Sequence, residues 1–345
     1  MVFFKISAGN AGQSNIEMKK ILITGATGFI GGALSDRLIW EGYNVQALVR
    51  NKGNVGFLSK EVRPISGDLF DKDALGHAME GVEEVYHLAA YARPWASDPA
   101  TYFRINVEGA ENVFKAAATK GVRRVVFTST AGVFGPSLDN PPVTEDSLRL
   151  TPLRTEYERS KAKAEALVQD LVKAGQDIVI VNPSRVYGPG QQTVSNGVTK
   201  MIRLYLAGKF RFYPGDGNSI GNYVFIEDVV NGHLLAMERG IAGERYALGG
   251  ENASYRTFFE QLSKVSGVQN RMFPLPVSVL RVGAHLLKVR ADWFGIAPML
   301  TPEWVDRFME HWALSTEKAE VALGYKPVSL TEGLQRTVDW LKLQT

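Results

Sequence analysis

The chain has 345 residues, of which 45% are hydrophobic and 22% are charged, a composition typical of a globular protein with one large or two modest domains. Its 39 basic and 36 acidic residues nearly balance, which argues against the basic surface of a nucleic-acid-binding protein. Cysteine is absent, so disulfides, zinc–thiolate sites, iron–sulfur clusters and cysteine nucleophiles are excluded. The same absence fits the cytoplasm, where we expect the protein.

The N-terminal segment 1–17 is expected to be an extension without a catalytic role. Its apolar run, Val2–Phe4, is too short for a secretory signal. No 18 consecutive apolar residues occur in the sequence, so no transmembrane span is expected.

The first predicted strand, Lys20–Thr24, runs directly into the glycine-rich segment GATGFIGG at 25–32, and a helix is predicted from Ala33 to Trp40. Strand, glycine turn and helix, in this order, are the context that a dinucleotide-binding motif requires. Glycines allow positive φ and close backbone approach, while the helix N-terminus offers N–H groups and partial positive charge to a pyrophosphate. The segment therefore predicts a dinucleotide site. The alternative is a glycine-rich turn without a ligand.

Strands and helices continue to alternate along the first half of the chain. Further strands are predicted at 43–49, 62–66, 83–89, 122–128 and 177–182, and helices at 100–119 and 156–173, among others. This alternation predicts an α/β fold, a Rossmann-type doubly wound parallel sheet with helices on both faces. We expect a dinucleotide-binding domain over 18–190, to which the segment around 222–240 returns, and a smaller, mainly helical substrate-binding part over 191–345.

The end of the predicted strand 43–49 suggests which dinucleotide binds. Arg50 follows it, and the segment Leu48–Lys52 contains no acidic residue. A guanidinium can bind a ribose 2′-phosphate that a carboxylate would repel. We therefore expect NADP rather than NAD, with Lys52 as a second candidate contact. An ordinary surface arginine at the start of a loop is the alternative.

Asp68 stands just after the next predicted strand, in Gly67-Asp68-Leu69. It either accepts a hydrogen bond from the adenine amino group or caps the helix that starts near Asp71.

Tyr157 and Lys161 stand four residues apart in the predicted helix 156–173, and hence on one face of it. By itself this spacing is equally typical of two surface residues. However, the strand 122–128 ends in hydroxyl residues, including Thr128 and Thr130, at the edge of the sheet where ligands bind.

These side chains suggest a redox reaction. A phenol has a pKa near 10, which a lysine ammonium and a nicotinamide cation would lower. The hydroxyl of Thr130 can hold a substrate oxygen in line with the phenol of Tyr157. Together they would catalyse hydride transfer between a nicotinamide and a carbonyl or alcohol.

With these motifs in order, the sequence resembles the extended short-chain dehydrogenases/reductases, also called the NAD-dependent epimerase/dehydratase superfamily. The resemblance runs from about Met18 to the C-terminus. It rests on TGATGFIGG from Thr24, GDL from Gly67, HLAA from His87, NVEGAENV from Asn106, FTSTAGVFG from Phe127, YERSK from Tyr157, NPSRVYGPG from Asn182, YVFIEDVVNGHLLA from Tyr223 and ALGYKPVSLTEGL from Ala322.

The resemblance implies roles for individual residues. Thr130 would be the catalytic hydroxyl, Tyr157 the acid/base, and Lys161 the residue that binds the nicotinamide ribose and tunes Tyr157. The cofactor-binding residues, besides Arg50, would be Gly25, Thr27, Gly28, Phe29, Ile30, Gly31, Asp68, Leu69, Leu88, Ala89, Ala90, Asn106, Thr128, Tyr157, Lys161, Pro183, Ser184 and Val186. The resemblance also implies a homodimer. No metal is expected, since the five histidines lack metal-ligand spacing.

Departures from the family pattern favour one group within it. Sugar-nucleotide epimerases often carry an Asn where this chain has Arg185, and an Arg in the position of the segment Ser219–Tyr223, which has none. Sugar dehydratases have an acidic pair where Ala131 and Gly132 stand. The sequence is more similar to the dihydroflavonol-4-reductase group, whose members reduce ketones and aldehydes.

We therefore expect an NADP(H)-dependent reductase of a small, apolar ketone or aldehyde, or a dehydrogenase of the alcohol. The apolar segment 272–300 is expected to form helices that line an apolar pocket and belong to the core. A cationic membrane-surface helix is the weaker interpretation of that segment. A nucleotide-sugar epimerase that retains NAD and a non-catalytic dinucleotide-sensing protein remain alternatives.

Overall fold

The structure, a computed structural model, describes residues 18–50, 55, 58–138, 141–191, 193 and 196–344. The predictions made for 1–17 and for Lys52 lie outside these residues. Within the described part, one large sheet contains seven strands: β1 (Lys20–Thr24), β2 (Asn44–Val49), β3 (Arg63–Ser66), β4 (Glu84–His87), β5 (Arg124–Thr128), β6 (Ile178–Pro183) and β10 (Arg245–Leu248). Their order is β10-β6-β5-β4-β1-β2-β3, and all neighbouring strands are parallel.

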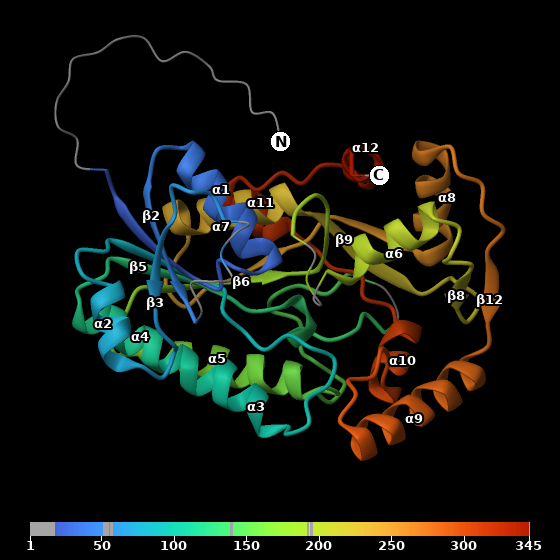
Figure 1. Cartoon of the computed structure of the whole chain (residues 1–345), viewed down its shortest axis with the longest axis horizontal. Coiled ribbons are helices and arrows are strands. Elements are labelled where there is room, and N and C mark those ends of the chain that lie inside the picture. The colour runs from blue at the N-terminus through green and yellow to red at the C-terminus, as the bar shows by residue number, and fades with distance from the viewer. Residues whose placement is uncertain are drawn as a thin grey trace, which may run out of the picture.

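Helices cover both faces of this sheet (Figure 1). One face carries α1 (Phe29–Trp40), α7 (Ile226–Arg239) and α11 (Glu317–Leu323), and the other α2 (Lys72–Ala78), α4 (Gly109–Thr119) and α5 (Glu156–Lys173). Along β1, Ile21 and Ile23 pack with the first group and Leu22 packs with the second. A strand covered on both sides is apolar along its centre, as Ile21, Leu22 and Ile23 are here. The doubly wound α/β fold expected from the sequence is confirmed.

The helix predicted over 100–119 is interrupted. It consists of α3 (Ala100–Phe103), a π-helical turn over Arg104–Glu108, and α4. Such turns insert one residue into a helix and often lie at functional sites. Here the turn contains Asn106, whose buried hydrogen bonds hold the segment that follows β4.

The chain beyond residue 190 contributes to the large sheet as well. Helix α7 packs on that sheet, and β10, for which the sequence had predicted no strand, completes its edge beside β6. The strand before α7, β9 (Ile220–Phe225), lies instead in a three-stranded sheet with β7 (Arg185–Tyr187) and β11 (Glu251–Ser254).

The remaining elements make up the C-terminal part (Figure 1). An aromatic core joins α6 (Gly197–Leu206), α8 (Tyr255–Ser266) and α12 (Leu330–Lys342), and β8 (Phe212–Pro214) pairs with β12 (Phe273–Leu275). Helices α9 (Val277–Phe294) and α10 (Pro302–Met309) pack together beside them.

Helix α9 presents an apolar face to the outside. Within it, Ala284 and Ala291 are buried, whereas Val282, Leu286 and Trp293 are 61, 67 and 80% exposed. The segment 272–300 therefore forms the expected helix, but this face does not line the expected pocket. No helix in the described ranges combines the length and apolar character needed to cross a bilayer.

Chain connectivity reverses direction between β1 and β4. From β1 the chain proceeds outward through β2 and β3, then returns to β4 on the other side. In open parallel sheets this point leaves a crevice at the carboxyl ends of the strands, where ligands bind.

Candidate active site

The loop between β1 and α1 leaves no room for side chains at two glycines. Gly25 has a φ of +78°, and a Cβ there would stand 2.6 Å from the backbone nitrogen of Ala89, just beyond β4. A Cβ on Gly31 would stand 2.2 Å from the carbonyl oxygen of Gly25. The loop is therefore pressed against both the end of β4 and the first turn of α1, a close packing that requires glycine.

Helix α1 presents its N-terminus to the crevice directly after this loop. Gly28 is the N-cap residue, and neither a capping side chain nor an acidic residue occupies the first turn. The first N–H groups of a helix have no intrahelical acceptor, so those of Phe29 and Ile30 are available to an anion. The predicted residues Gly25, Thr27, Gly28, Phe29, Ile30 and Gly31 thus form one concave backbone surface. Such a surface fits a dinucleotide pyrophosphate.

Arg50 and Asp68 follow the ends of the neighbouring strands β2 and β3. Arg50 is exposed there. Asp68 accepts the N–H of Phe70 at 3.0 Å, and is partly exposed. The helix-cap alternative for Asp68 is wrong, because the cap of α2 is Asp71, which accepts the N–H of Ala74 at 2.9 Å.

The segment after β4 is held by Asn106. The predicted cofactor-binding residues in this region are Leu88 and Ala89, both partly buried, the exposed Ala90, and Leu69, which packs against Gly109 of α4. Asn106 is 1% exposed, accepts the N–H of Tyr91 at 2.7 Å, and donates to the hydroxyl of Ser160 in α5 at 2.9 Å. It therefore ties this segment to the helix that carries Tyr157.

Tyr157 and Thr130 meet at the carboxyl edge of the sheet. Thr130 lies just beyond β5 and Tyr157 lies in the first turn of α5, and the Thr130 side chain acts to lower the pKa of the Tyr157 phenol. The Thr130 hydroxyl also accepts the N–H of Gly132 at 3.1 Å. Burial raises the pKa of Tyr157 to about 12, while Arg307 and Thr130 oppose this rise. At neutral pH Tyr157 is therefore a phenol that has a proton to donate.

Lys161 lies one turn further along α5 and is 1% exposed. Its Nζ donates to the carbonyl oxygen of Thr128 at 2.7 Å and lies 4.5 Å from the ring centroid of Phe127. Burial lowers the pKa of Lys161 to about 7, and Glu165 opposes this effect. The sequence had suggested that Lys161 lowers the pKa of Tyr157. In the structure the lowering cation is Arg307, because Lys161 points toward β5 and is only partly charged at neutral pH.

Two buried histidines support the strand ends. His233 accepts a hydrogen bond from the hydroxyl of Thr128 at 2.8 Å, and its other ring nitrogen donates to the carbonyl oxygen of Val229 at 2.7 Å. His87 shares a hydrogen bond of 2.6 Å with the hydroxyl of Thr24. Burial lowers the pKa of His233 to about 4 and, together with the nearby lysine, that of His87 to about 3. Both are neutral at physiological pH.

The predicted nicotinamide residues lie at and beyond the end of β6. Pro183 is buried and pairs with Leu248 of β10. The hydroxyl of Ser184 donates to Asn222 at 2.6 Å, and Val186 is half-buried in β7. The structure thus places all three on the side of the crevice that leads to the C-terminal part.

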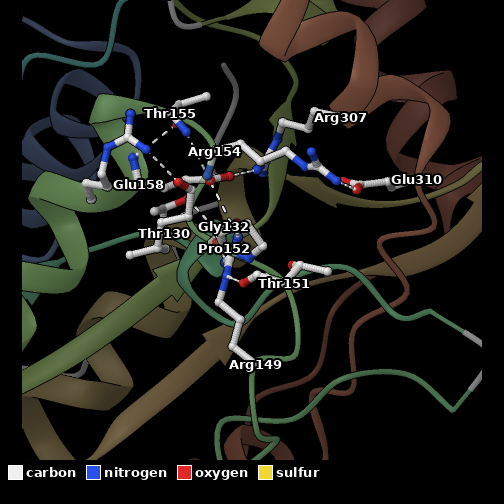
Figure 2. A network of polar contacts seen from close by, with 12 residues as sticks. Thr130, Gly132, Arg149, Thr151, Pro152, Arg154, Thr155, Glu158, Arg307 and Glu310 are labelled. Carbon is white, nitrogen blue, oxygen red and sulfur yellow. Dashed lines mark hydrogen bonds and ion pairs between the residues drawn. The ribbon is translucent and has the colours of Figure 1, made fainter.

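Sequence reasoning missed a cation beside Tyr157. Arg307 of α10 forms an ion pair with Glu158, the residue that follows Tyr157 (Figure 2). A Cβ on Gly132 would lie 3.1 Å from Nη2 of Arg307 and 3.4 Å from the Thr130 hydroxyl, so the guanidinium borders the turn that carries Thr130. No local spacing connects Arg307 with this turn.

Glu158 itself could have been found from the sequence. Thr155 and Glu158 form the T-x-x-E pattern of a capping box at the start of α5. The structure contains both bonds of that box.

A second buried carboxylate, Glu165, supports Lys161 from the next turn of α5. Asn182 donates to Glu165 at 2.7 Å and to the carbonyl oxygen of Thr130 at 3.1 Å, and Arg245 lies 3.7 Å from the other carboxylate oxygen. Burial raises the pKa of Glu165, and these partners oppose the rise. The network joins α5, β6 and β10 to the turn at Thr130.

The arrangement is suited to hydride-transfer chemistry. A phenol that can donate a proton, a hydroxyl held beside it and a buried lysine stand next to a glycine loop that fits a dinucleotide. Bound there, a nicotinamide would supply the hydride. The described residues contain no cluster of three histidine or acidic side chains able to hold a metal ion.

Comparisons with known proteins agree with this geometry. Residues 21–249 match the model of the NAD dependent epimerase/dehydratase family. A 2-alkyl-3-oxoalkanoate reductase of Stenotrophomonas maltophilia is 32% identical over 341 residues, which cover 92% of this chain and 98% of the relative. A Synechocystis protein whose name assigns it provisionally to the dihydroflavonol 4-reductases is 31% identical over 327 residues, covering 93% of this chain and 94% of its own. The solved structure of a Thermotoga maritima UDP-glucose 4-epimerase with UDP-glucose has a TM-score of 0.77 at 25% identity, covering 94% of this chain and 99% of that one.

The chain therefore belongs to the NAD dependent epimerase/dehydratase family of extended short-chain dehydrogenases/reductases. Within that family it falls into the dihydroflavonol-4-reductase-like group, and it is an NAD(P)-dependent enzyme. The resemblance drawn from the ordered motifs is confirmed.

Proposed function

We propose that this enzyme transfers a hydride between NADP(H) and the carbonyl or alcohol carbon of a small, largely apolar substrate, with Thr130, Tyr157 and Lys161 as catalytic residues. The observation that carries the proposal is the placement of Thr130 and Tyr157 together at the carboxyl edge, with Lys161 one turn away. The name of the Stenotrophomonas relative, which specifies a 3-oxoalkanoate, supports a ketone substrate.

In the reducing direction, Tyr157 donates its proton to the carbonyl oxygen as the carbonyl carbon accepts a hydride. The Thr130 hydroxyl holds that oxygen beside the phenol. Proton donation leaves Tyr157 as a phenolate, which Arg307 and the protonated form of Lys161 stabilise. In the oxidising direction the same groups act in reverse, with the phenolate as base.

The preference for NADP rests on Arg50. It is exposed just after β2, where a guanidinium can meet a ribose 2′-phosphate. The matching family is described by its dependence on NAD, so the choice between the two dinucleotides is part of the proposal.

A nucleotide-sugar epimerase that retains NAD is the second candidate, supported by the likeness to the Thermotoga epimerase. Two features of this chain argue against an epimerase function. Arg185, at the position of the epimerases' asparagine, donates to the hydroxyls of Tyr223 and Tyr255 at 3.3 and 3.2 Å. The segment Ser219–Tyr223 carries no arginine that could hold a diphosphate.

The proposal includes a cytoplasmic location and a homodimer formed through α4 and α5. The absence of cysteine supports the location, and the family resemblance supports the dimer. Light scattering of the purified protein, compared with a mass of 38.0 kDa for one chain, tests the dimer.

The deciding experiment identifies the cofactor and how firmly it is held. The purified protein is denatured and any released dinucleotide identified, and the intact protein is titrated with NADPH and NADH. Little retained cofactor, tighter NADPH binding and turnover of ketones or aldehydes would support the reductase. Stoichiometric retained NAD with turnover of a sugar nucleotide would instead favour the epimerase.

A further inference from the structure

The charged cluster around Glu158 contains more positive than negative charge (Figure 2). Its cations are Arg149, Arg154 and Arg307, and its anions are Glu158 and Glu310. Three guanidinium groups share two carboxylates, so one positive charge is left unbalanced within the cluster. A buried or half-buried ion without a partner is costly, and a bound anion would remove that cost.

The three arginines differ in how many of their N–H groups have an acceptor within the protein. Arg149 donates to three backbone carbonyl oxygens at 2.6, 2.8 and 3.1 Å and thereby fixes the loop before α5. Arg154 pairs with Glu310, but its buried Nε has no hydrogen-bond partner among the described residues. Arg307 donates from Nη1 to Glu158, and no side chain or carbonyl in the described ranges accepts from its Nη2 or Nε.

The guanidinium of Arg307 lies close to the turn that carries Thr130. A Cβ on Gly132 would lie 3.1 Å from Nη2, 3.5 Å from Nη1 and 3.4 Å from the hydroxyl of Thr130. Because residue 132 is a glycine, the guanidinium and the hydroxyl can both approach its backbone closely, where a Cβ would be crowded.

Two tryptophan rings pack against the guanidinium and hold it in place. Its Cζ lies 3.7 Å from the ring centroid of Trp312 and 5.6 Å from that of Trp304, and the side chain is 18% exposed. The indole N–H of Trp312 donates to the backbone carbonyl of Arg307 at 2.9 Å. Ionic hydrogen bonds are stronger in such a low-dielectric setting than in water.

We propose that Arg307 is a substrate-binding residue that holds a carboxylate of the substrate beside the reacting carbon, so that the substrates are 3-oxo or 3-hydroxy carboxylic acids. This inference rests on the hydride-transfer function proposed above and names its substrate class. In a 3-oxo acid a single carbon separates the carbonyl from the carboxylate. The carbonyl oxygen can therefore contact Thr130 and Tyr157 while the carboxylate contacts Arg307.

Calorimetric titration with octanoate and with octanamide tests the site without requiring turnover. The two probes have the same chain and nearly the same shape, but only octanoate is charged. With the protein saturated by whichever dinucleotide it binds, octanoate should bind about tenfold or more tightly than octanamide. Arg307→Met should remove that preference. Equal binding of the two probes by the unaltered protein would overturn the proposal.

Two further variants separate the role of Arg307 from damage to the fold. Glu158→Gln keeps the capping box, which accepts glutamine, and removes the competing carboxylate. Its octanoate affinity should be unchanged or up to about fivefold higher. Arg281→Met is the matched control, since Arg281 is an exposed arginine of α9 that pairs with Asp306 of α10 at 2.8 Å. Loss of the octanoate preference in all three variants would overturn the proposal, because α9–α10 packing would then explain it.

Turnover measurements show whether the proposed carboxylate site or the proposed hydride transfer is wrong. Reduction of neutral ketones as efficiently as 3-oxo acids would leave hydride transfer standing and overturn the carboxylate site. An Arg307-dependent octanoate preference in a protein that converts no carbonyl or alcohol would support the anion site and overturn the proposed reaction. Arg307-dependent binding of UDP, without binding of octanoate, would overturn the carboxylate assignment in favour of a sugar nucleotide.

Discussion

The cofactor side and the substrate side of the active-site edge are built in different ways. On the cofactor side, the backbone makes the surface: Gly25 and Gly31 let a loop, a strand end and a helix approach closely. On the substrate side, side chains make the surface, and they come from α5, from the turn at Thr130 and from α10. A backbone surface depends on a few consecutive residues, whereas the side-chain surface exists only after distant segments have packed. The two sides should therefore respond differently to substitution.

Tyr157→Phe should have the largest effect, and on the substrate side alone. The ring and its packing remain, but the proton donor is gone, so turnover should fall about 10²- to 10⁴-fold. Dinucleotide affinity should be nearly unchanged, because no part of the glycine loop is altered. Steady-state kinetics together with a dinucleotide titration measure both quantities. Retained turnover would remove Tyr157 from the mechanism.

Gly31→Ala should act on the cofactor side, through crowding. Its new Cβ would stand 2.2 Å from the carbonyl oxygen of Gly25, so we expect a loss of about 1–3 kcal/mol in unfolding free energy and weaker dinucleotide binding.

Gly32→Ala is the matched control for that variant, because the nearest atom to its Cβ would lie 3.6 Å away. Alanine in this helix should add about 0.5–1 kcal/mol to the unfolding free energy. Urea unfolding of both variants tests the contrast. A similar loss in both would show that close backbone packing is not the decisive property.

Arg50→Asp should change which dinucleotide binds without changing the reaction. Replacing a guanidinium by a carboxylate should reduce the NADPH to NADH preference by about tenfold or more. Arg63→Asp makes the same charge change at the start of β3, the opposite edge of the sheet, and should leave the ratio as it is. Titration of each variant with both dinucleotides gives the ratios. If the ratio is the same in both variants, Arg50 does not select the cofactor.

The smallest expected effect is a pH dependence of the unfolding free energy caused by His233, which is hydrogen-bonded to Thr128 at the end of β5. Burial lowers the pKa of His233 from 6.5 to about 4 in the folded state. As the pH falls below 6.5, His233 becomes protonated in the unfolded chain but stays neutral in the folded chain. The unfolding free energy therefore decreases until the pH reaches about 4. Between pH 6.5 and 5.5 the loss should be about 1 kcal/mol larger than in His233→Gln. Urea unfolding at the two pH values measures this difference, and parallel behaviour of the two proteins would contradict the assignment.

The same contrast explains which parts of the molecule could be predicted from the sequence. Strand β1 and helix α5 begin and end where they were predicted, since a short apolar run before a glycine-rich turn and a helical pattern are local signals. The prediction of one continuous helix over 100–119 was wrong at its centre, because the buried hydrogen bonds of Asn106, a tertiary effect, favour a π-helical turn there.

No local pattern in the sequence could have indicated the role of Arg307, since its partner Glu158 lies in the other half of the chain. The direction of the Tyr157 pKa shift was unpredictable for the same reason: it depends on burial and on Arg307.

Glu158 has a consequence for attempts to exchange substrate specificity between relatives. This one side chain completes the cap of the helix that carries Tyr157 and also holds Arg307 from the far end of the chain. A recombinant in which all residues after 190 come from a relative would separate Glu158 from Arg307. Glu158 would then face whichever residue the relative has at the position of Arg307. Transferring the C-terminal part by itself is therefore not sufficient. Residues 155–158 at the start of α5 must be transferred together with α10, so that both the helix cap and the ion pair are kept.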